Sequence, residues 1–252
     1  MIRGIEASHS AMKYLQKKQD IVANNISNTG TVGFKEQIIT AKSKEKMNII
    51  NRSTGEEVGF TNPGVESNKL YEISDQGTIV DTSIQTDFAI FGEGYFTVEM
   101  TDGSYGYTRD GSFNFDVNGR LVTAKGYPVI AKDIATGRKT YIEADEGNIK
   151  VNSDGSIGNT RTGGTKFSVV KFENPQLLTR IGENLYASGN NQPQENITYT
   201  VKQFSLENSN VDMASQMIKM LEVSRGYSAN QRAIKANDET LQKAVNVLGS
   251  LK

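Results

Sequence analysis

The sequence predicts an α+β protein, with long N- and C-terminal helices that form a coiled-coil layer around a central antiparallel all-β domain, a small barrel or sandwich. Three observations support this fold class. Apolar residues recur with a helical period at both ends of the 252-residue chain. Between positions 51 and 200 lie 19 of the 24 glycines and all four prolines. Charge divides the same way, because residues 1–50 carry +4, residues 201–252 carry +2 and the centre carries −7.

The N-terminal segment predicts a helix that ends near Asn28, because Asn tolerates a left-handed conformation and Gly30 and Gly33 follow. Positions spaced alternately by four and three residues form a heptad seam, and six of the eight are apolar. Lysines occupy the other faces. The seam consists of Met1, Ile5, Ser8, Met12, Leu15, Gln19, Val22 and Ile26.

The C-terminal segment repeats this design over eleven seam positions, of which eight are apolar or aromatic. Asn210 or Ser209 can cap the start of the helix, with Asp212 in the first turn, and Gly249 ends it. The predicted seam consists of Met213, Met217, Met220, Ser224, Tyr227, Gln231, Ile234, Asp238, Leu241, Val245 and Leu248.

Two interpretations of these helices remain open. They are ordinary amphipathic helices packed on the chain's own centre, or they behave as a coiled coil. In the second case the seams pair with each other, pair with other subunits, or stay disordered until they do, because an exposed apolar seam is a liability. We expect a lone subunit to be unable to bury both seams, so that the ends order only on assembly.

The centre predicts antiparallel β-structure. Asp102-Gly103, Asp110-Gly111 and Asn118-Gly119 recur at an eight-residue interval, and such dipeptides are strong two-residue hairpin signals. The expected organisation is a terminal helix and turn over 1–35, an extended connector over 36–70, a β-domain over 71–206 and a C-terminal assembly helix over 207–252.

Composition excludes several classes of chemistry. The chain has no Cys and one His, which leaves no thiolate metal site, disulfide or multi-histidine site. Its net charge of −1 gives no global basic field for nucleic acid. No apolar stretch approaches the roughly 20 residues that span a bilayer, so we expect no direct membrane insertion. We predict no catalytic residue, no cofactor and no metal.

Two sequence segments are candidates for a chemical site. A calcium loop beginning at Asn114 places Lys125 where a bidentate Glu is needed. Carboxylate pairs, Asp110 with Asp116 or Asp81 with Asp87, could act on a glycan. Their turn contexts explain both without catalysis.

Asn24, Asn25 and Asn28 form an unusual cluster at a predicted helix end, because Asn is a poor helix former. One interpretation is simple fraying. The other is that their amides satisfy backbone groups in a packed turn between subunits.

The segment Ala23-Asn-Asn-Ile-Ser-Asn-Thr-Gly-Thr-Val-Gly-Phe-Lys35 closely resembles the N-terminal signature of bacterial flagellar rod and hook proteins. The segments Asn210–Ala214 and Tyr227-x-x-Asn230 resemble the closing segment of that family, although Gly226 stands where the family more often has Ala. The centre matches as well, in Asp87–Phe96, Tyr107–Phe113 and Gly119–Thr123.

The resemblance implies a structural subunit of the flagellar rod, the axial drive shaft of the basal body. Such a subunit polymerises helically through its terminal helices, transmits torque and forms the export channel. Ile181–Tyr186 and Gly33-Phe34-Lys35 are more similar to the distal than to the proximal rod group. The implied partners are copies of itself, other rod and hook subunits, and the flagellar type III export apparatus. The implied location is the basal body in the cell envelope, reached without a cleaved signal peptide.

The seams, the asparagine cluster and the signature turn together give an expected assembly interface. It consists of Ile5, Met12, Leu15, Val22, Asn24, Asn25, Ile26, Asn28, Gly33, Phe34, Met213, Met217, Met220, Tyr227, Ile234, Leu241, Val245 and Leu248. Two alternatives stay open beside this function: a secreted glycan-acting enzyme that uses carboxylates of the β-domain, and a cytosolic coiled-coil adaptor.

Overall fold

The computed structural model describes residues 2–144, 149–158, 164–182, 184–195 and 197–249, with side chains in the terminal helices described from 4 to 246. The chain forms two compact units. The helical unit contains 1–27, 37–72 and 212–252, and the β unit contains 28–36 and 73–211. Both termini therefore belong to one unit, as does the segment that was expected to be a connector.

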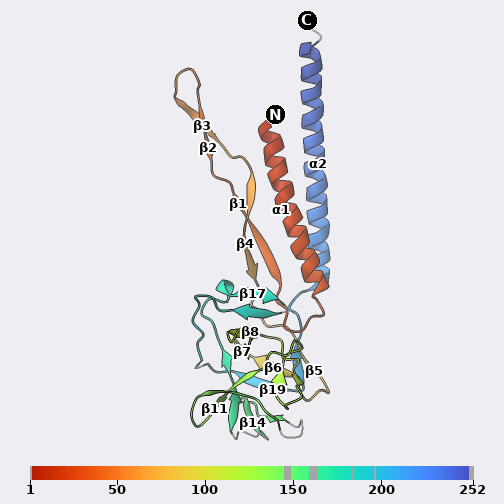
Figure 1. The fold of residues 1–252 in the computed structure, drawn as a ribbon. Helices are drawn as coiled ribbons and strands as arrows, with labels where there is room; N and C mark the ends of the chain where they lie inside the picture. Colours follow the sequence, from red (N-terminus) through yellow and green to blue (C-terminus); the bar gives the residue numbers. More distant parts are fainter. Residues whose placement is uncertain (1, 145–148, 159–163, 183, 196, 250–252) are drawn as a thin grey trace. The chain divides into compact units, whose positions relative to one another are not determined.

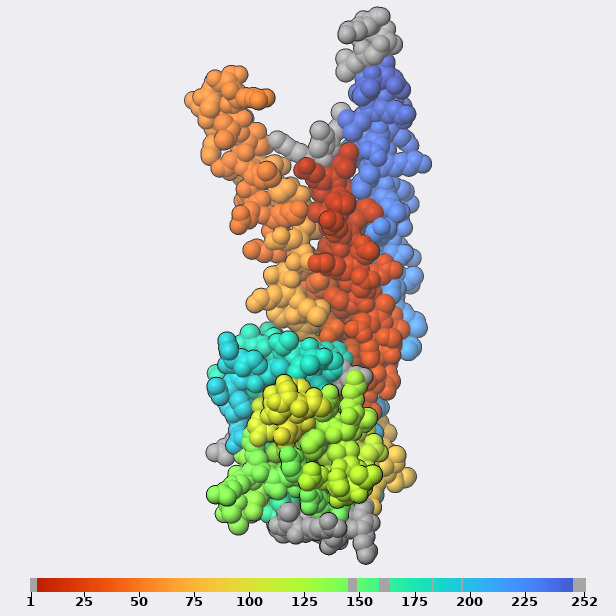
Figure 2. Space-filling model, in the orientation of Figure 1, coloured from red at the N-terminus to blue at the C-terminus, as the bar shows by residue number. Residues whose placement is uncertain are grey.

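In the helical unit, α1 (Ile2–Ser27) packs against α2 (Met213–Gly249). Its other side contacts β1 (Gln37–Ser43) and β4 (Val65–Glu72). Figure 1 shows α1 between α2 and these strands, and Figure 2 shows the same order as red between blue and orange surfaces. The two terminal helices thus pack together, which confirms the predicted α+β class.

The strands of the helical unit form a two-stranded antiparallel ribbon. β1 pairs with β4, and further along β2 (Met47–Ile50) pairs with β3 (Glu57–Thr61). Bulges interrupt both pairings. Because an isolated two-stranded hairpin is marginal in water, α1 supplies the surface that supports β1 and β4.

The start of α2 differs from the predicted cap. Asp212 is the N-cap, because its two carboxylate oxygens accept hydrogen bonds from Ala214 N and Ser215 N at 3.2 and 3.1 Å. Asn210 instead accepts a bond from Glu36 N and donates to Ile73 O within the β unit. An acidic N-cap accepts hydrogen bonds from the free N–H groups, and its negative charge interacts favourably with the helix dipole. These two effects explain why Asp212 occupies the N-cap position.

The β unit consists of antiparallel pairings. Two five-stranded sheets have the orders β16-β7-β8-β18-β17 and β12-β11-β15-β14-β13, beside the pairs β19-β6, β20-β5 and β10-β9. The elements are β5 (Ile79–Asp81), β6 (Phe88–Phe91), β7 (Tyr95–Glu99), β8 (Tyr105–Thr108), β9 (Asn114–Phe115), β10 (Leu121–Val122), β11 (Ile130–Asp133), β12 (Lys139–Tyr141), β13 (Lys150–Val151), β14 (Ser156–Gly158), β15 (Thr165–Phe167), β16 (Val169–Val170), the 3-10 helix η1 (Pro175–Leu177), β17 (Thr179–Gly182), β18 (Leu185–Ala187), β19 (Thr200–Gln203) and β20 (Ser205–Glu207).

Four phenylalanines form the centre of this unit's core. Phe88, Phe96, Phe113 and Phe167 are buried, and Phe96 lies 5.3 Å, centroid to centroid, from both Phe113 and Phe167. Edge-to-face packing of this kind adds to the free energy gained from burial alone.

Two of the three predicted hairpin turns are confirmed. Asp102-Gly103 joins β7 to β8, and Asn118-Gly119 joins β9 to β10, with both glycines at φ +78°. The prediction for Asp110-Gly111 is wrong. A Cβ at Gly111 would lie 1.7 Å from Phe88 O, and Gly111 O accepts a hydrogen bond from Phe88 N. This glycine therefore permits close approach to β6 instead of forming a hairpin.

Candidate functional site

The terminal helices meet in a regular antiparallel register. Gly4 lies beside Asn237 and Gly226 lies beside Leu15, so that a step of eleven residues along α1 matches eleven along α2. A Cβ at Gly226 would lie 3.3 Å from Leu15 Cδ1. The glycine that departs from the family pattern therefore lets the two helices approach closely. The two helices pack against each other within one chain. The predicted seam residues Met213, Met217 and Val245 nevertheless stay exposed, so this pairing leaves part of the predicted seams unburied.

The side of α2 that faces α1 is rotated from the predicted seam. Gln216 and Val223 are each 1% exposed, whereas the predicted seam residue Met217 is 51% exposed. Gln216 accepts a hydrogen bond from Asn25 Nδ2 at 3.3 Å. A polar residue can occupy a helix interface when it has a hydrogen-bond partner. The prediction counted only apolar residues, so it chose the row of Met217 instead of the row of Gln216.

The rotation leaves large apolar side chains on the opposite side of α2. Exposed fractions range from 43% to 60% for Met213, Met217, Ile218 and Leu221, which we call the outer stripe. At about 100° per residue, the four residues of this stripe lie roughly 70° to 150° around the helix from the row of Gln216 and Val223 that faces α1. It is a candidate contact surface, because large exposed apolar patches mark interaction sites.

Asn25 fastens α1 to the start of β1. Its Nδ2 donates to Gln37 O at 2.8 Å, and its Oδ1 accepts from Gln37 N at 3.0 Å. Asn24 Nδ2 donates a longer bond to Gln37 Oε1 at 3.4 Å. The Asn25 amide thus satisfies backbone groups within its own chain, where it is 1% exposed.

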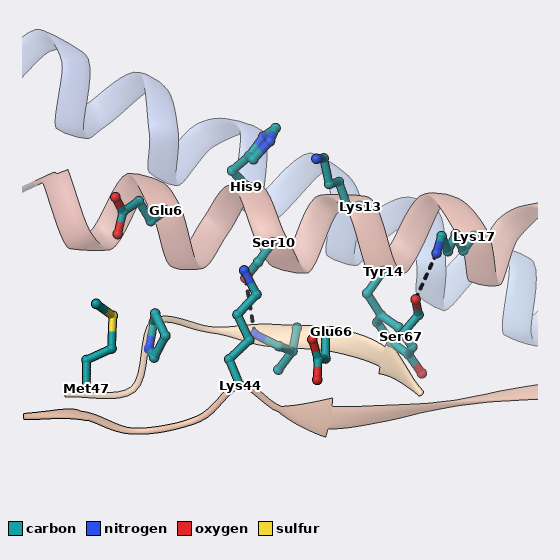
Figure 3. A pocket seen from close by; sticks show the side chains of 12 residues that line it. Glu6, His9, Ser10, Lys13, Tyr14, Lys17, Lys44, Met47, Glu66 and Ser67 are labelled. Carbon is teal, nitrogen blue, oxygen red and sulfur yellow. Dashed lines mark hydrogen bonds between the residues drawn. The ribbon is translucent and has the colours of Figure 1, made fainter. Parts of the chain in front are cut away.

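A groove of about 630 Å³ lies between α1 and the ribbon. Figure 3 shows Ser10 and Tyr14 directed from α1 towards the ribbon. Ser10 Oγ accepts a bond from Val65 N, and Lys17 Nζ donates to Ser67 Oγ at 2.9 Å. The residues that line the groove are Glu6, His9, Ser10, Lys13, Tyr14, Lys17, Lys44, Met47, Pro63, Val65, Glu66 and Ser67.

The signature turn, residues 28–36, belongs to the β unit. Gly33 has φ +67°, and a Cβ there would lie 2.7 Å from Arg109 C and Asp110 N. Phe34 is 0% exposed and lies under the Arg180 guanidinium at 4.7 Å. Both residues are buried within the β unit of their own chain.

Lys35 completes the signature through a buried ionic network. Its Nζ donates to Glu207 Oε1 at 2.5 Å and to Asp75 O at 2.7 Å. Glu207 Oε2 accepts a bond from Arg109 at 3.1 Å, and Gly77 N donates to Oε1. Burial lowers the pKa of Lys35, although the Glu207 charge raises it. Two cations and one carboxylate therefore connect the signature turn to β20 and to Arg109, the residue that follows β8.

The remaining expected interface residues lie along the helices. Ile5, Met12, Leu15, Ile26, Asn28, Met220, Tyr227, Ile234 and Leu241 are half-buried, Val22 is buried, and Asn24, Met213, Met217 and Val245 are exposed. The side chain of Leu248 lies outside the described residues.

The carboxylates that were candidates for catalysis mostly stabilise turns. Asp110 Oδ1 accepts bonds from Ser112 N and Oγ, and Asp116 Oδ1 accepts from Asn118 N and Arg120 N. Burial raises the pKa of Asp110, whereas backbone N–H donors lower that of Asp116. Asp81 binds Lys202 at 2.6 Å.

Among the described residues, no group of three or more His, Cys, Asp or Glu side chains is placed to hold a metal ion. No helix within the described ranges is long and apolar enough to cross a membrane.

Sequence reasoning missed three residues of these sites: Gln37, Gln216 and Glu207. The pairs that they form span 12, 191 and 172 positions. A Glu a few residues before a predicted helix, in a chain with a Gly-Phe-Lys signature, is a weak sequence signal that could have pointed to Glu207.

Comparison with known proteins agrees with this architecture. Residues 5–35 match the family model described as "Flagella basal body rod protein". Residues 89–159 match "Flagellar hook protein FlgE/F/G D1 domain", and residues 202–247 match "Flagellar basal body rod FlgEFG protein C-terminal". The three matches fall on α1 with the signature turn, on the β unit, and on β19 through α2.

Similarity to curated relatives extends over the whole chain. The flagellar basal-body rod protein FlgG of Bacillus subtilis is 35% identical, covering 98% of this chain and 99% of the relative. FlgG of Borreliella burgdorferi is 33% identical with the same coverage. The flagellar hook-basal body complex protein FlhO of Bacillus subtilis is 29% identical over 100% of both chains.

Proposed function

The chain belongs to the flagellar basal-body rod proteins, and from this premise we propose how it builds the rod. It is a structural, non-enzymatic subunit of the basal-body rod, similar to FlgG of the distal rod, and a member of the hook-basal body complex. Family membership sets aside both the glycan-acting enzyme and the cytosolic adaptor.

The proposed assembly uses the helical unit. Copies of the chain polymerise helically through α1 and α2, contact other rod and hook subunits at the ends of the rod, transmit torque and enclose the export channel. The observation that carries this proposal is the outer stripe, because Met217 and Ile218 are 51% and 60% exposed on a helix whose other side is buried.

The expected interface residues divide between two roles in this proposal. Met213, Met217 and Val245 are exposed and available to another subunit. The buried residues Val22 and Asn25 act indirectly, because they hold α1 in place against α2 and β1. The half-buried seam residues contribute to both roles.

Delivery is proposed to occur through the flagellar type III export apparatus, without cleavage of a signal peptide. A cysteine-free chain suits export in an unfolded state, since no disulfide has to form afterwards. Deleting the export apparatus should leave the chain inside the cell, and intact mass analysis of the exported chain should show an uncleaved N-terminus.

The deciding experiment is localisation in a strain in which the chromosomal gene is deleted and a tagged copy is supplied. We expect the tagged chain in purified basal bodies, loss of motility in the deletion strain, and recovery with the copy. A motile deletion strain, or basal bodies that lack the chain, would contradict the function.

A further inference from the structure

We propose that the outer stripe of α2 in one copy seats in the groove between α1 and the ribbon of the next copy. The inference rests on the proposed function, because it names the surfaces through which rod subunits join. The stripe is Met213, Met217, Ile218 and Leu221, and the groove is the cavity of about 630 Å³ shown in Figure 3.

The two surfaces lie on opposite edges of the helical unit. The order across the unit is ribbon, groove, α1, α2 and stripe, and Figure 2 shows the hollow between the orange ribbon and red α1 on the side away from blue α2. A chain with one projection on one edge and one recess on the other forms heterologous contacts, which repeat without limit.

The groove suits the stripe in volume and in kind. Pro63, Val65, Met47 and the ring of Tyr14 contribute apolar surface. Its volume lies in the range of sites that enclose a drug-sized ligand, so it can take up a few large side chains. Met, Ile and Leu are the side chains that the stripe presents.

Charge at the edges favours the same pairing. Lys13, Lys17 and Lys44 line the groove beside two acids, Glu6 and Glu66. Glu222 is exposed and follows Leu221 at the edge of the stripe. Among the described residues, neither Glu222 nor Lys13 makes a side-chain hydrogen bond or ion pair, so both are available across an interface.

The stripe and the groove lie at different positions along the helix axis, and this difference determines the symmetry of the assembly. By the register of α1 and α2, Met217 is level with Asn24, whereas the groove spans Glu6 to Lys17. An offset of about 12 residues corresponds to roughly 18 Å along the helix axis. Each added copy is displaced by this amount, so the contact produces a helical assembly and not a flat closed ring.

The test uses the absence of cysteine from the chain. Ile218→Cys and Lys13→Cys are placed in two full-length copies produced together in a strain without its own gene. Purified basal bodies are treated with a short bismaleimide. The matched control is Ser228→Cys, which is exposed on the same side of α2 but level with Lys13.

We expect the Ile218→Cys and Lys13→Cys pair to give covalent dimers at least fivefold above the Ser228→Cys and Lys13→Cys pair. Stronger linkage for Ser228→Cys would overturn the stagger, and dimers from Ile218→Cys alone would show stripe meeting stripe. Absence of dimers from basal bodies that contain the chain would overturn the inference and leave the function standing. Absence of the chain from basal bodies would overturn both.

A second variant separates docking from folding. Ile218→Lys should abolish rod assembly and motility, while the purified chain keeps the circular dichroism spectrum of the unaltered protein. Ser228→Lys should retain motility. Normal motility with Ile218→Lys would count against the inference.

Discussion

Asn25 and Gln37 exchange two hydrogen bonds, in which a side-chain amide pairs with both backbone groups of a residue at the start of β1. The two bonds resemble those between paired residues of neighbouring β-strands, except that the side-chain amide of Asn25 takes the place of one backbone. Asn25 Nδ2 also donates to Gln216 Oε1, so one buried amide joins α1, α2 and β1. The asparagine signature is therefore a junction within the helical unit.

Asn25→Ala should open this junction, because it leaves the buried N–H and C=O of Gln37 without their partner. The expected loss is about 2–4 kcal/mol of local stability. Hydrogen exchange at the Gln37 amide should accelerate more than tenfold. The control is Asn24→Ala, which removes a partly buried, longer bond to the Gln37 side chain and should change the exchange rate by less than about fivefold. Equal effects from both variants would refute the junction.

Gly226→Ala should show coupling to Leu15. Alanine gains about 1 kcal/mol of helix propensity over glycine. In the unaltered chain the new methyl group meets Leu15 Cδ1 at 3.3 Å, which offsets this gain. In a Leu15→Ala background the full gain should appear, measured by urea unfolding followed at 222 nm. The same effect in both backgrounds would show that the two residues are not in contact.

Gly33→Ala should destabilise the β unit by roughly 2–4 kcal/mol, since the methyl group combines a left-handed conformation with overlap against the backbone of Arg109. The matched control is Gly30→Ala. A Cβ at Gly30 has nothing within 4 Å, so this change should be tolerated. Thermal unfolding followed by the near-ultraviolet signal of the tyrosines checks both. A Gly33→Ala protein as stable as the control would contradict the assignment.

Glu207→Gln should be strongly destabilising, by about 3–5 kcal/mol, because Lys35 and Arg109 would remain buried without a counter-charge. Glu143→Gln provides the control. It breaks a partly exposed pair with Arg120 and should cost about 1 kcal/mol or less. Chemical denaturation of the two variants measures the difference. A loss for Glu207→Gln no larger than that of the control would mean that the network adds little.

Asp110→Asn should stabilise the β unit at neutral pH. Burial and then the nearby Asp87 charge raise the pKa of Asp110 above 3.8, while the bonds from Ser112 act in the opposite direction. Stability from a raised pKa is fully present below the unfolded value and is lost as pH rises through the folded one. The amide keeps the acceptor for Ser112 without the charge.

The stability difference between Asp110→Asn and the unaltered chain should therefore grow as pH rises above 3.8, and then become constant. Urea midpoints measured from pH 3.5 to 7 test this. Asp116→Asn should behave in the opposite way, because backbone N–H donors lower the pKa of Asp116. A difference for Asp110→Asn that shrinks with rising pH would contradict the sign.

Local patterns determined the extents of the terminal helices and two of the three hairpins. Helix periodicity and Asn-Gly or Asp-Gly turns act over a few residues, so they can be recognised without knowledge of distant partners. Gly111 shows the limit. Its dipeptide matches a hairpin, but the contact with Phe88 that decides its conformation lies outside the local window.

The sequence by itself determined the α+β class, the helices at both ends and the membership suggested by the asparagine signature, because periodicity and short motifs carry them. Only the tertiary structure decided which row of α2 faces α1, since Gln216 becomes an interface residue through its bond to Asn25. It also decided that Lys35 is buried. Its charge is compatible with folding because Glu207, 172 positions away in the sequence, lies beside it. Such pairings depend on three-dimensional proximity, which no local pattern encodes.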